Sequence, residues 1–475
     1  MNAELYLVLD QGGHSSRALV FDATGEVVAH AAVPVTSDQP YPGWVEQNPR
    51  ELVNSLKQAA AQAVRQLDRK QAGRLVSAAL VTQRSSLVCW HKTKGQALYP
   101  VISWQDRRAA QWLKQQQIDV AWVRRRTGLT PSPHYGASKI RWCLDHVDRT
   151  RQAHADGELV CGPLAGYLIN QLTGGNRNLI DPANASRTLL WNIRTLNWDK
   201  ELLNCFGIDE AILPNLAATE FDYGDLLVEK IRIPLKLVNG DQSAALFANG
   251  LPASHTAYIN AGTGAFISIP LDEKSSSPDS LLKSLAHQGK ELWMVAEGTV
   301  NGAASALDWA RQELGLVDAD LNNGMEQERN LPLFINGVAG LGSPFWSELA
   351  SEFIGDGNTR QKLEAVLESI LFLLRVNLLE MQQVRLAVRS LSLSGGLSRI
   401  DRFCQKLADL NAMPVLRPAQ TEASARGAAF WLAGCPAGWT SPENRIFLPS
   451  LRGNEIISAR FRHWHRELLT RLDPG

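Results

Sequence analysis

The feature that most constrains the fold is a strand, glycine turn, strand pattern that occurs once in each half of the chain. In the first half, LYLVLD at 5–10 runs into a Gly-Gly turn and then into RALVFD at 17–22. In the second half, AYINAGTGAFISIPL at 257–271 has the same order. Apolar runs joined by a short glycine turn predict hairpins. A chain that repeats this unit predicts an α/β protein with a duplicated architecture.

Length points the same way. The chain has 475 residues, which is more than one hydrophobic core usually serves, so two or three domains are expected. No low-complexity linker separates the halves, and the segment GLPASH at 250–255 breaks the pattern of strands and helices. We therefore predict an N-terminal domain over 1–250 and a C-terminal domain over 251–475, with a cleft between them.

Helices are predicted between the strands. In NPRELVNSLKQAAAQAVRQL at 48–67, Asn48 can cap the helix, Pro49 suits its first position, and apolar residues recur at helical spacing. Further helices are expected over 301–314 and 359–384. These helices should pack on the sheets.

Two buried strands are predicted to run straight into polar residues, LVSAALVTQ at 75–83 and LYPVISW at 98–104. Folds of the α/β class place their sites at the carboxyl ends of such strands. Candidate contacts to a small hydroxylated substrate at these ends are Arg84, Trp104 and Asp106. We expect Arg107 and Arg108 to form surface ion pairs of little energetic weight.

Charge and cysteine content limit the partners. Lys plus Arg and Asp plus Glu both number 48, so nothing favours nucleic acid or an anionic membrane as the main partner. The six cysteines show no metal-binding spacing and are expected to be small buried residues in a reducing compartment. The apolar run at 370–379 is too short to span a bilayer. We predict a cytoplasmic protein, and the sequence leaves a homo-oligomer open.

The first glycine turn has the residues that a phosphate cradle needs. Two glycines let the backbone approach a phosphate, and hydroxyl and guanidinium groups beside them can donate to it. Asp10, at the end of a buried strand, suits a hydrated Mg²⁺ held through water. An ordinary hairpin turn would give the same local pattern. The candidate phosphate contacts are Gly12, Gly13, His14, Ser15 and Arg17.

The second turn, NAGTGAF at 260–266, provides a second candidate phosphate site with Gly262, Thr263 and Gly264. Two such turns facing a shared cleft would clamp a polyphosphate from both sides. A Gly pair at 395–396, between a strand and a helix, could lie against a flat base or ribose, although a tight turn alone would also explain it.

Asp241 follows the apolar strand PLKLV and precedes a helix. A carboxylate at that point can accept the proton of a substrate hydroxyl as the hydroxyl attacks phosphorus. In isolation, helix capping would be the better explanation of an Asp here. Its combination with two phosphate turns favours the catalytic role.

With these pieces in order, the sequence resembles the FGGY family of carbohydrate kinases, and within it the glycerol kinases most closely. The resemblance covers nearly the whole chain. It rests on these segments: LDQGGHSSRALVFD, PGWVEQNP, TQRSS, SWQDRRAA, YGASKIRWCLDHV, DPANASRTLLWNIRTLNWD, GDQSAALF, GTGAF, EGTVNGAASALDWAR, GLGSPFW, LSLSGGLSR and TEASARGAAFWLAG. It implies two actin-like, ribonuclease-H-like domains with a nucleotide cleft between them, and phosphate transfer from ATP, with Mg²⁺, to a primary hydroxyl of a polyol or sugar.

The resemblance also implies roles for single residues. Asp241 matches the catalytic base and Asp10 the metal-associated carboxylate, with both near the Mg²⁺ through water. Thr263 matches the hydroxyl of the second phosphate turn, and Gly395 and Gly396 match the adenosine-binding pair. The residues that match alcohol contacts of the glycerol kinases are Arg84, Trp104, Asp241, Gln242 and Phe266.

Four residues depart from the family pattern. Ser85 stands where the glycerol kinases have a Glu, and His134 stands where they have a Tyr. These two are candidate substrate contacts, and they put glycerol itself in doubt because a lost carboxylate leaves substrate hydroxyls unpaired. Gly13-His14 replaces the hydroxyl pair of the first phosphate turn.

The sequence therefore supports two functions. The first is an ATP-dependent kinase, a transferase of carbohydrate metabolism that phosphorylates a glycerol-like polyol or a ketose. The second is a regulatory protein that keeps nucleotide and sugar binding but has lost efficient transfer, as Gly13-His14 would allow.

Overall fold

A computed structural model describes residues 4–174, 177–272, 277–315, 331–384, 387–419, 422–439 and 444–473. The chain forms two compact units. Unit 1 comprises Met1–Leu251 together with Ser284–Met294 and Glu422–Thr440, and unit 2 comprises the remaining segments. Two stretches from the second half of the sequence thus belong to unit 1.

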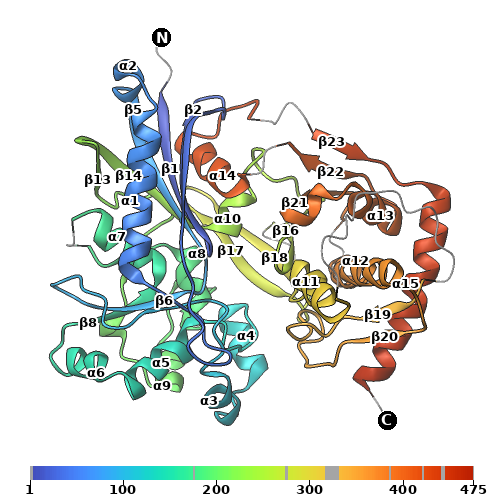
Figure 1. The fold of residues 1–475 in the computed structure, drawn as a ribbon. Coiled ribbons are helices and arrows are strands. Elements are labelled where there is room, and N and C mark those ends of the chain that lie inside the picture. Colours follow the sequence, from blue (N-terminus) through green and yellow to red (C-terminus); the bar gives the residue numbers. More distant parts are fainter. Residues whose placement is uncertain are drawn as a thin grey trace. The chain divides into compact units, whose positions relative to one another are not determined.

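Unit 1 is built on a six-stranded sheet in which β1 lies near the middle (Figure 1). The strand order is β13 (Asp225–Val228), β14 (Ile231–Gly240), β5 (Leu75–Thr82), β1 (Leu5–Gln11), β2 (Ser15–Asp22) and β3 (Val27–Pro34). The pairs β1/β2 and β2/β3 are antiparallel, as the hairpin pattern predicts, whereas β5 is parallel to both β1 and β14.

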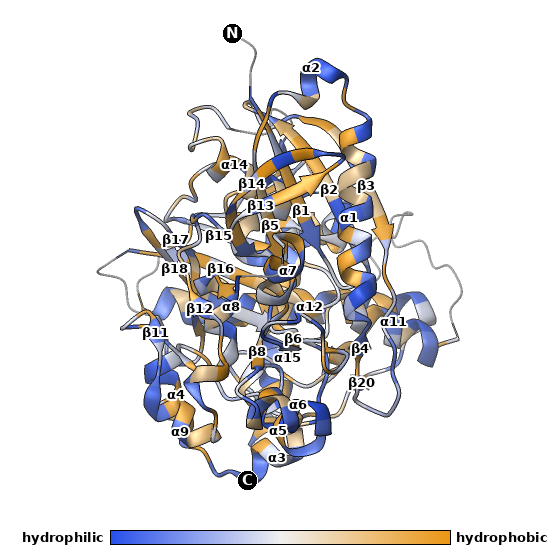
Figure 2. Cartoon of the chain, turned by 90° about the vertical axis from the view of Figure 1, so that its left-hand side faces the viewer, coloured by the Kyte–Doolittle hydropathy of each residue, from blue (hydrophilic) through white to orange (hydrophobic). Residues whose placement is uncertain are grey.

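Helix α1 (Pro49–Arg65) covers this sheet. It begins where the sequence predicts, because the Asn48 side chain accepts hydrogen bonds from the Arg50 and Glu51 amides and Pro49 takes the first turn. The sheet strands are largely hydrophobic, whereas α1 has one hydrophobic and one hydrophilic face (Figure 2). The buried face of the helix packs on β2 and β3.

The rest of unit 1 contains short sheets and helices. A four-stranded sheet has the order β4 (Glu46–Gln47), β7 (Val101–Ile102), β6 (Leu87–His91) and β8 (Leu159–Pro163). Two-stranded sheets pair β9 (Leu179–Ile180) with β12 (Asn215–Leu216), and β10 (Trp191–Asn192) with β11 (Asn197–Trp198). The helices are α2 (Arg69–Ala72), α3 (Ala110–Gln115), α4 (Val120–Thr127), α5 (Gly136–His146), α6 (Asp148–Ala155), α7 (Leu164–Leu172), α8 (Pro182–Ala185), η1 (Ser186–Thr188), α9 (Lys200–Phe206), η2 (Glu210–Ile212), α10 (Asp241–Ala245) and α14 (Ala423–Leu432).

Unit 2 repeats the arrangement on a seven-stranded sheet. The order is β17 (Leu282–Gln288), β18 (Leu292–Val300), β16 (Ala265–Leu271), β15 (Thr256–Ala261), β21 (Ser390–Ser394), β22 (Val415–Pro418) and β23 (Asn444–Phe447), with most of β17 and the start of β18 in the segment assigned to unit 1. The pair β15/β16 is antiparallel, like β1/β2 in unit 1. Strand β21 is parallel to β15, just as β5 is parallel to β1. The predicted duplication is confirmed.

The core of unit 2 lies around the long helix α12 (Thr359–Gln383), which matches the helix predicted over 359–384. The other elements are α11 (Ala304–Glu313), β19 (Leu333–Ile335), β20 (Glu352–Ile354), η3 (Gly396–Arg399), α13 (Asp401–Asn411) and α15 (Leu451–Leu472). No helix in the described part of the chain is long and apolar enough to cross a membrane.

Four expectations from the sequence are wrong. The strand predicted over 98–104 is only Val101–Ile102. Asp106 and Arg108 form a buried ion pair at 2.7 Å, with both side chains 0% exposed and the Arg108 guanidinium 3.9 Å from the Trp44 ring centre. Asp106 also accepts the Val45 amide, so it is a structural residue, and Arg108 is no surface ion pair. Four cysteines are buried, but Cys205 is exposed.

Candidate functional site

The candidate site of unit 1 lies where three neighbouring strands end. Parallel pairing places Gln11 of β1 and Gly240 of β14 both opposite Thr82 of β5. The residues that follow these strand ends therefore gather at one edge of the sheet, where α/β folds hold their ligands. Asp10, Arg84 and Asp241 are at this edge.

In the first glycine turn the carbonyls accept hydrogen bonds, while two of the amides have no acceptor among the described residues. The Gly13 carbonyl accepts the Gln47 side chain at 2.9 Å, the His14 carbonyl accepts the Val35 amide, and the Gly12 amide donates to the Ser15 carbonyl. Among the described residues, the Gly13 and His14 amides have no acceptor. Adjacent backbone N–H groups without acceptors form a concavity that suits an anion.

Asp10 is a buried carboxylate with one free oxygen. Its Oδ2 pairs with Arg17 at 2.7 Å, and Arg17 is also bound to Glu422 at 2.7 Å. Its Oδ1 is buried without a hydrogen-bond partner among the described residues. Burial raises the pKa of Asp10 to about 6, Arg17 opposes this rise, and Asp241 and Glu422 add to it. The structure thus places Arg17 between two carboxylates beside the turn.

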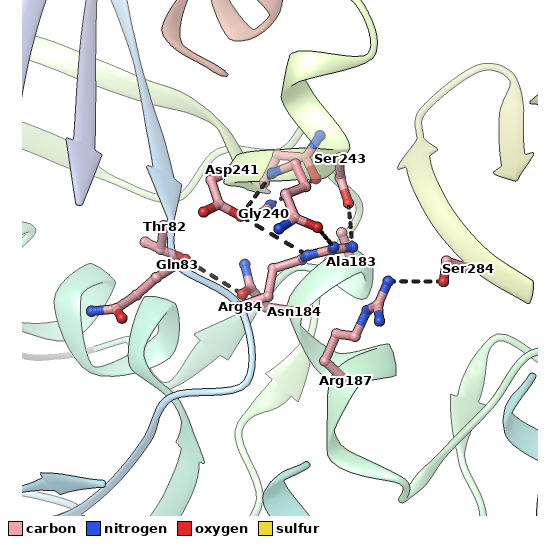
Figure 3. A network of polar contacts seen from close by, with 12 residues as sticks. Thr82, Gln83, Arg84, Ala183, Asn184, Arg187, Gly240, Asp241, Ser243 and Ser284 are labelled. Atoms are coloured by element: carbon pink, nitrogen blue, oxygen red, sulfur yellow. Dashed lines mark hydrogen bonds and ion pairs between the residues drawn. The ribbon is translucent and has the colours of Figure 1, made fainter. Parts of the chain in front are cut away.

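Asp241 is the first residue of α10 and stands at the end of β14 (Figure 3). Its Oδ1 accepts the Gln242 amide at 2.7 Å and lies 3.9 Å from Nε of Arg84. The Asp241 side chain is 30% exposed, whereas Arg84 is buried. Burial raises the pKa of Asp241, and the Arg84 guanidinium opposes this rise. Arg84 in turn donates to the Gln242 and Ser243 side chains.

Trp104, His134 and Ser85 carry the other alcohol contacts expected from the sequence. The Trp104 and His134 rings meet edge to face with centres 5.6 Å apart. Burial and the nearby Lys139, Arg187 and Arg84 charges hold the pKa of His134 well below its usual range, so its imidazole is neutral at pH 7. Ser85 is buried, and its hydroxyl has no partner among the described residues.

In unit 2, the second glycine turn follows β15 and the Gly pair follows β21. These strands are parallel neighbours with Asn260 opposite Ser394, so the turn and the pair share an edge. The Thr263 carbonyl accepts amides at the start of α11, while the Thr263 and Gly264 amides have no acceptor in the described chain. Gly395 has φ +88°, and a Cβ there would meet the Ala261 carbonyl oxygen at 2.5 Å. Phe266 lies on β16, also in unit 2.

Several polar residues at the site of unit 1 were not assigned a role from the sequence. Gln47 and Gln83 hydrogen-bond to each other at 2.8 Å, and both reach carbonyls of the first turn. Arg187 is buried and donates to Ser284 at 2.8 Å (Figure 3). The run of polar residues after β5 could have indicated Gln83, whereas only the fold brings Gln47 and Arg187 to this edge.

The donor set fits a magnesium ion that is held mainly by other ligands. Among the described residues, no group of three or more His, Cys, Asp or Glu side chains could hold a metal. Mg²⁺ usually binds one or two carboxylates and completes its shell with water and substrate phosphates. The free Oδ1 of Asp10 beside the phosphate turn is consistent with such binding.

Comparison with known proteins gives the family. The model of the FGGY family of carbohydrate kinases matches residues 5–248 with its N-terminal domain and residues 257–434 with its C-terminal domain. This chain belongs to the FGGY family of carbohydrate kinases. The FGGY kinase is 36% identical over 451 residues to a glycerol kinase of Geobacter sp. (strain M21), covering 92% of this chain and 90% of the relative. It is 32% identical over 490 residues to a glycerol kinase of Saccharolobus islandicus (strain M.14.25 / Kamchatka #1), covering 98% of this chain and 96% of the relative.

Solved structures confirm the two-domain α/β fold class. A Plasmodium falciparum glycerol kinase with ADP matches with a TM-score of 0.86 and 22% identity, covering 99% of this chain and 98% of that one. A gluconate kinase from Lactobacillus acidophilus matches with a TM-score of 0.84 and 19% identity, covering 99% of each chain. The FGGY kinase is an ATP-dependent enzyme that phosphorylates a polyol or sugar.

Proposed function

We propose that this enzyme transfers the terminal phosphoryl group of ATP to a primary hydroxyl of a small polyol or ketose, with Asp241 as the general base. The observation that carries the proposal is the placement of Asp241 at the end of β14, beside Arg84 and with a raised pKa. A base with a pKa nearer the working pH transfers protons more effectively in both directions.

In the proposed step, one proton transfer accompanies the formation of one P–O bond and the breaking of another. The substrate hydroxyl gives its proton to the Asp241 carboxylate, its oxygen forms a bond to the γ-phosphorus, and the bond from that phosphorus to the bridging oxygen breaks to release ADP. Arg84, with its Nε 3.9 Å from the Asp241 carboxylate, opposes the rise in the pKa of Asp241 and so favours the charged form before the proton arrives.

We propose that Asp10 and Asp241 hold Mg²⁺ through water. The ion, when bound, would neutralise the charge that develops on the phosphate oxygens. The Oδ1 of Asp10 is the atom available for this role, because Oδ2 is paired with Arg17. The free amides of Gly13 and His14 would donate to phosphate oxygens, which makes up in part for the missing hydroxyl pair.

We assign the alcohol and the first phosphate turn to an N-terminal domain over 1–250. The second phosphate turn, around Thr263, and the adenosine pair are assigned to a C-terminal domain over 251–475. Phe266 would add an apolar contact to the alcohol. A cytoplasmic location is proposed because the enzyme uses ATP and its cysteines are free, as is usual in a reducing compartment.

The alcohol pocket that we propose differs from that of a glycerol kinase at Ser85 and His134. At Ser85 a hydroxyl, which donates and accepts, stands in place of a carboxylate, which only accepts. At His134 a neutral imidazole stands in place of a phenol hydroxyl; both donate and accept, but they differ in shape and reach. We therefore expect a substrate with a different set of hydroxyl or carbonyl groups from glycerol, such as a tetritol, pentitol or ketose. Family membership does not favour the regulatory alternative without transfer.

A coupled ADP-release assay over glycerol, tetritols, pentitols, pentuloses and heptuloses tests this proposal. At least one compound should be turned over with Mg²⁺ and ATP, and product analysis should find the phosphate on a primary carbon. Turnover of no compound above the background of the Asp241→Asn variant would reject it. Turnover of glycerol in strong preference to all others would reject the assigned roles of Ser85 and His134.

A further inference from the structure

Lys139 is a fully buried lysine on α5 that binds three backbone carbonyls. Its Nζ donates to the carbonyl oxygens of Ser85 at 3.0 Å, Ser103 at 2.8 Å and His134 at 2.8 Å. The side chain is 0% exposed. An ammonium has three donors and no acceptor, so these three bonds use its full capacity.

The three carbonyls come from three separate segments of unit 1. One follows β5, one follows β7, and one precedes α5. Each segment carries a residue that we propose as an alcohol contact, namely Ser85, Trp104 next to Ser103, and His134. A single buried group therefore joins the backbones of three segments that carry proposed alcohol contacts.

Burial of this lysine is costly, which argues against an accidental contact. Lys139 has no ion pair within the described chain, since the nearby Asp106 is bound to Arg108. Burial lowers the pKa of Lys139 to about 7, Asp106 raises it and Arg108 lowers it further. A buried cation is retained only where its hydrogen bonds compensate the loss of water.

The backbone at Ser85 shows what the lysine holds. Ser85 has φ +66°, a left-handed backbone conformation that residues other than glycine rarely adopt. Such strain persists only where surrounding contacts fix it, and it is frequent at ligand sites. The Ser85 hydroxyl is left buried and without a partner in the described chain, so it is available to a ligand.

We propose that Lys139 is a positioning residue that fixes the Ser85, Trp104 and His134 segments in the geometry that binds the alcohol. This inference rests on the proposed function of the site. It predicts that removal of the ammonium weakens alcohol binding while ATP binding is kept.

The kinetic test compares Lys139→Met with Lys406→Met as a matched control. Lys406 is a largely buried lysine of unit 2 that pairs with Glu364 and Glu368, so its loss also removes a buried charge. We expect Lys139→Met to raise the alcohol KM at least about tenfold, with the ATP KM within about twofold of the wild type. Lys406→Met should leave the alcohol KM unchanged. An alcohol KM that is unchanged in Lys139→Met, or raised equally in both variants, would overturn the inference.

Hydrogen exchange gives a readout that does not depend on turnover. Backbone amides in 84–86, 103–105 and 132–135 should exchange faster in Lys139→Met, and the same peptides should be unchanged in Lys406→Met. Lack of faster exchange in these segments overturns the inference. Failure of the wild type to turn over any alcohol would reject the proposed function instead, and the exchange result would still decide the role of Lys139.

A conservative variant covers the case in which Lys139→Met does not fold. Lys139→Arg keeps the charge, but a planar guanidinium cannot present one compact group to three converging carbonyls. If both variants fold, we expect the alcohol KM of Lys139→Arg to lie between those of the wild type and Lys139→Met. If only Lys139→Arg is soluble, we expect its alcohol KM to be at least about threefold above that of the wild type. An alcohol KM equal to the wild type, together with unchanged exchange, would contradict the proposal.

Discussion

Replacement of Asp10 by asparagine should stabilise the ligand-free protein and abolish its activity. Asp10 is 1% exposed, and its Oδ1 has no partner among the described residues. Its pKa of about 6 lies roughly two units above the ordinary value of 3.8, and one unit corresponds to about 1.4 kcal/mol. The buried charge therefore costs about 3 kcal/mol near neutral pH. This cost is already net of the attraction to Arg17, so asparagine is expected to gain about 2–3 kcal/mol near neutral pH.

The pH dependence of this gain follows from the direction of the shift. A raised pKa means that the folded state binds a proton more readily than the unfolded state between about pH 4 and pH 6. Stability of the wild type should therefore fall as the pH rises through this window. The asparagine variant has no proton to lose, so its advantage should be full above about pH 6 and should vanish near pH 4.

Urea unfolding followed by tryptophan fluorescence, without Mg²⁺ or nucleotide, measures this difference at about pH 4.5 and pH 7.5. The exposed Asp38 provides the control, and Asp38→Asn should show no pH-dependent gain. An Asp10→Asn variant that is less stable than the wild type at pH 7.5 would refute the reasoning. A gain of equal size at both pH values would refute it too, because the gain would then not come from the buried charge.

Two further predictions concern the glycine turns. Gly395→Ala should raise the ATP KM at least about tenfold, because its φ of +88° and the 2.5 Å approach to the Ala261 carbonyl exclude a Cβ. Gly396→Ala meets no protein atom within 4 Å, so it should fold normally, and a raised ATP KM in this variant would report contact between residue 396 and the nucleotide. An unchanged ATP KM in both variants would contradict the role of the pair. A Cβ at Gly13 meets nothing closer than 3.9 Å, so the double change Gly13→Thr with His14→Thr should fold. Its kcat should rise if the missing hydroxyls limit transfer, and a lower kcat would show that His14 acts as the donor.

Local sequence was sufficient for the hairpins, several helices and the strand ends that carry the site. The hairpins, the Asn48 cap and the positions of Asp10 and Asp241 follow from short-range patterns, which the structure reproduces. Such patterns depend on neighbours in the chain, so one sequence contains the information needed. The duplicated sheet followed from recognising the same pattern twice.

The residues that support the site could not be found in this way, because their partners are distant in the sequence. Lys139 meets the carbonyl of Ser85, 54 positions away, and Arg17 meets Glu422, 405 positions away. Arg108 was expected at the surface for the same reason, since its burial depends on aromatic rings from other segments. Long-range packing decides these contacts, and no short-range pattern marks them.

The most direct test of the central claim is the kinetics of Asp241→Asn with the best alcohol from the substrate panel. Loss of a general base should lower kcat by a factor of about 10²–10⁴. The KM values for alcohol and ATP should stay within a few-fold of the wild type. The Oδ1 of the asparagine can still accept the backbone N–H of Gln242, and Arg84 keeps its bond to Ser243. A kcat within about threefold of the wild type would contradict the assignment of Asp241 as the base.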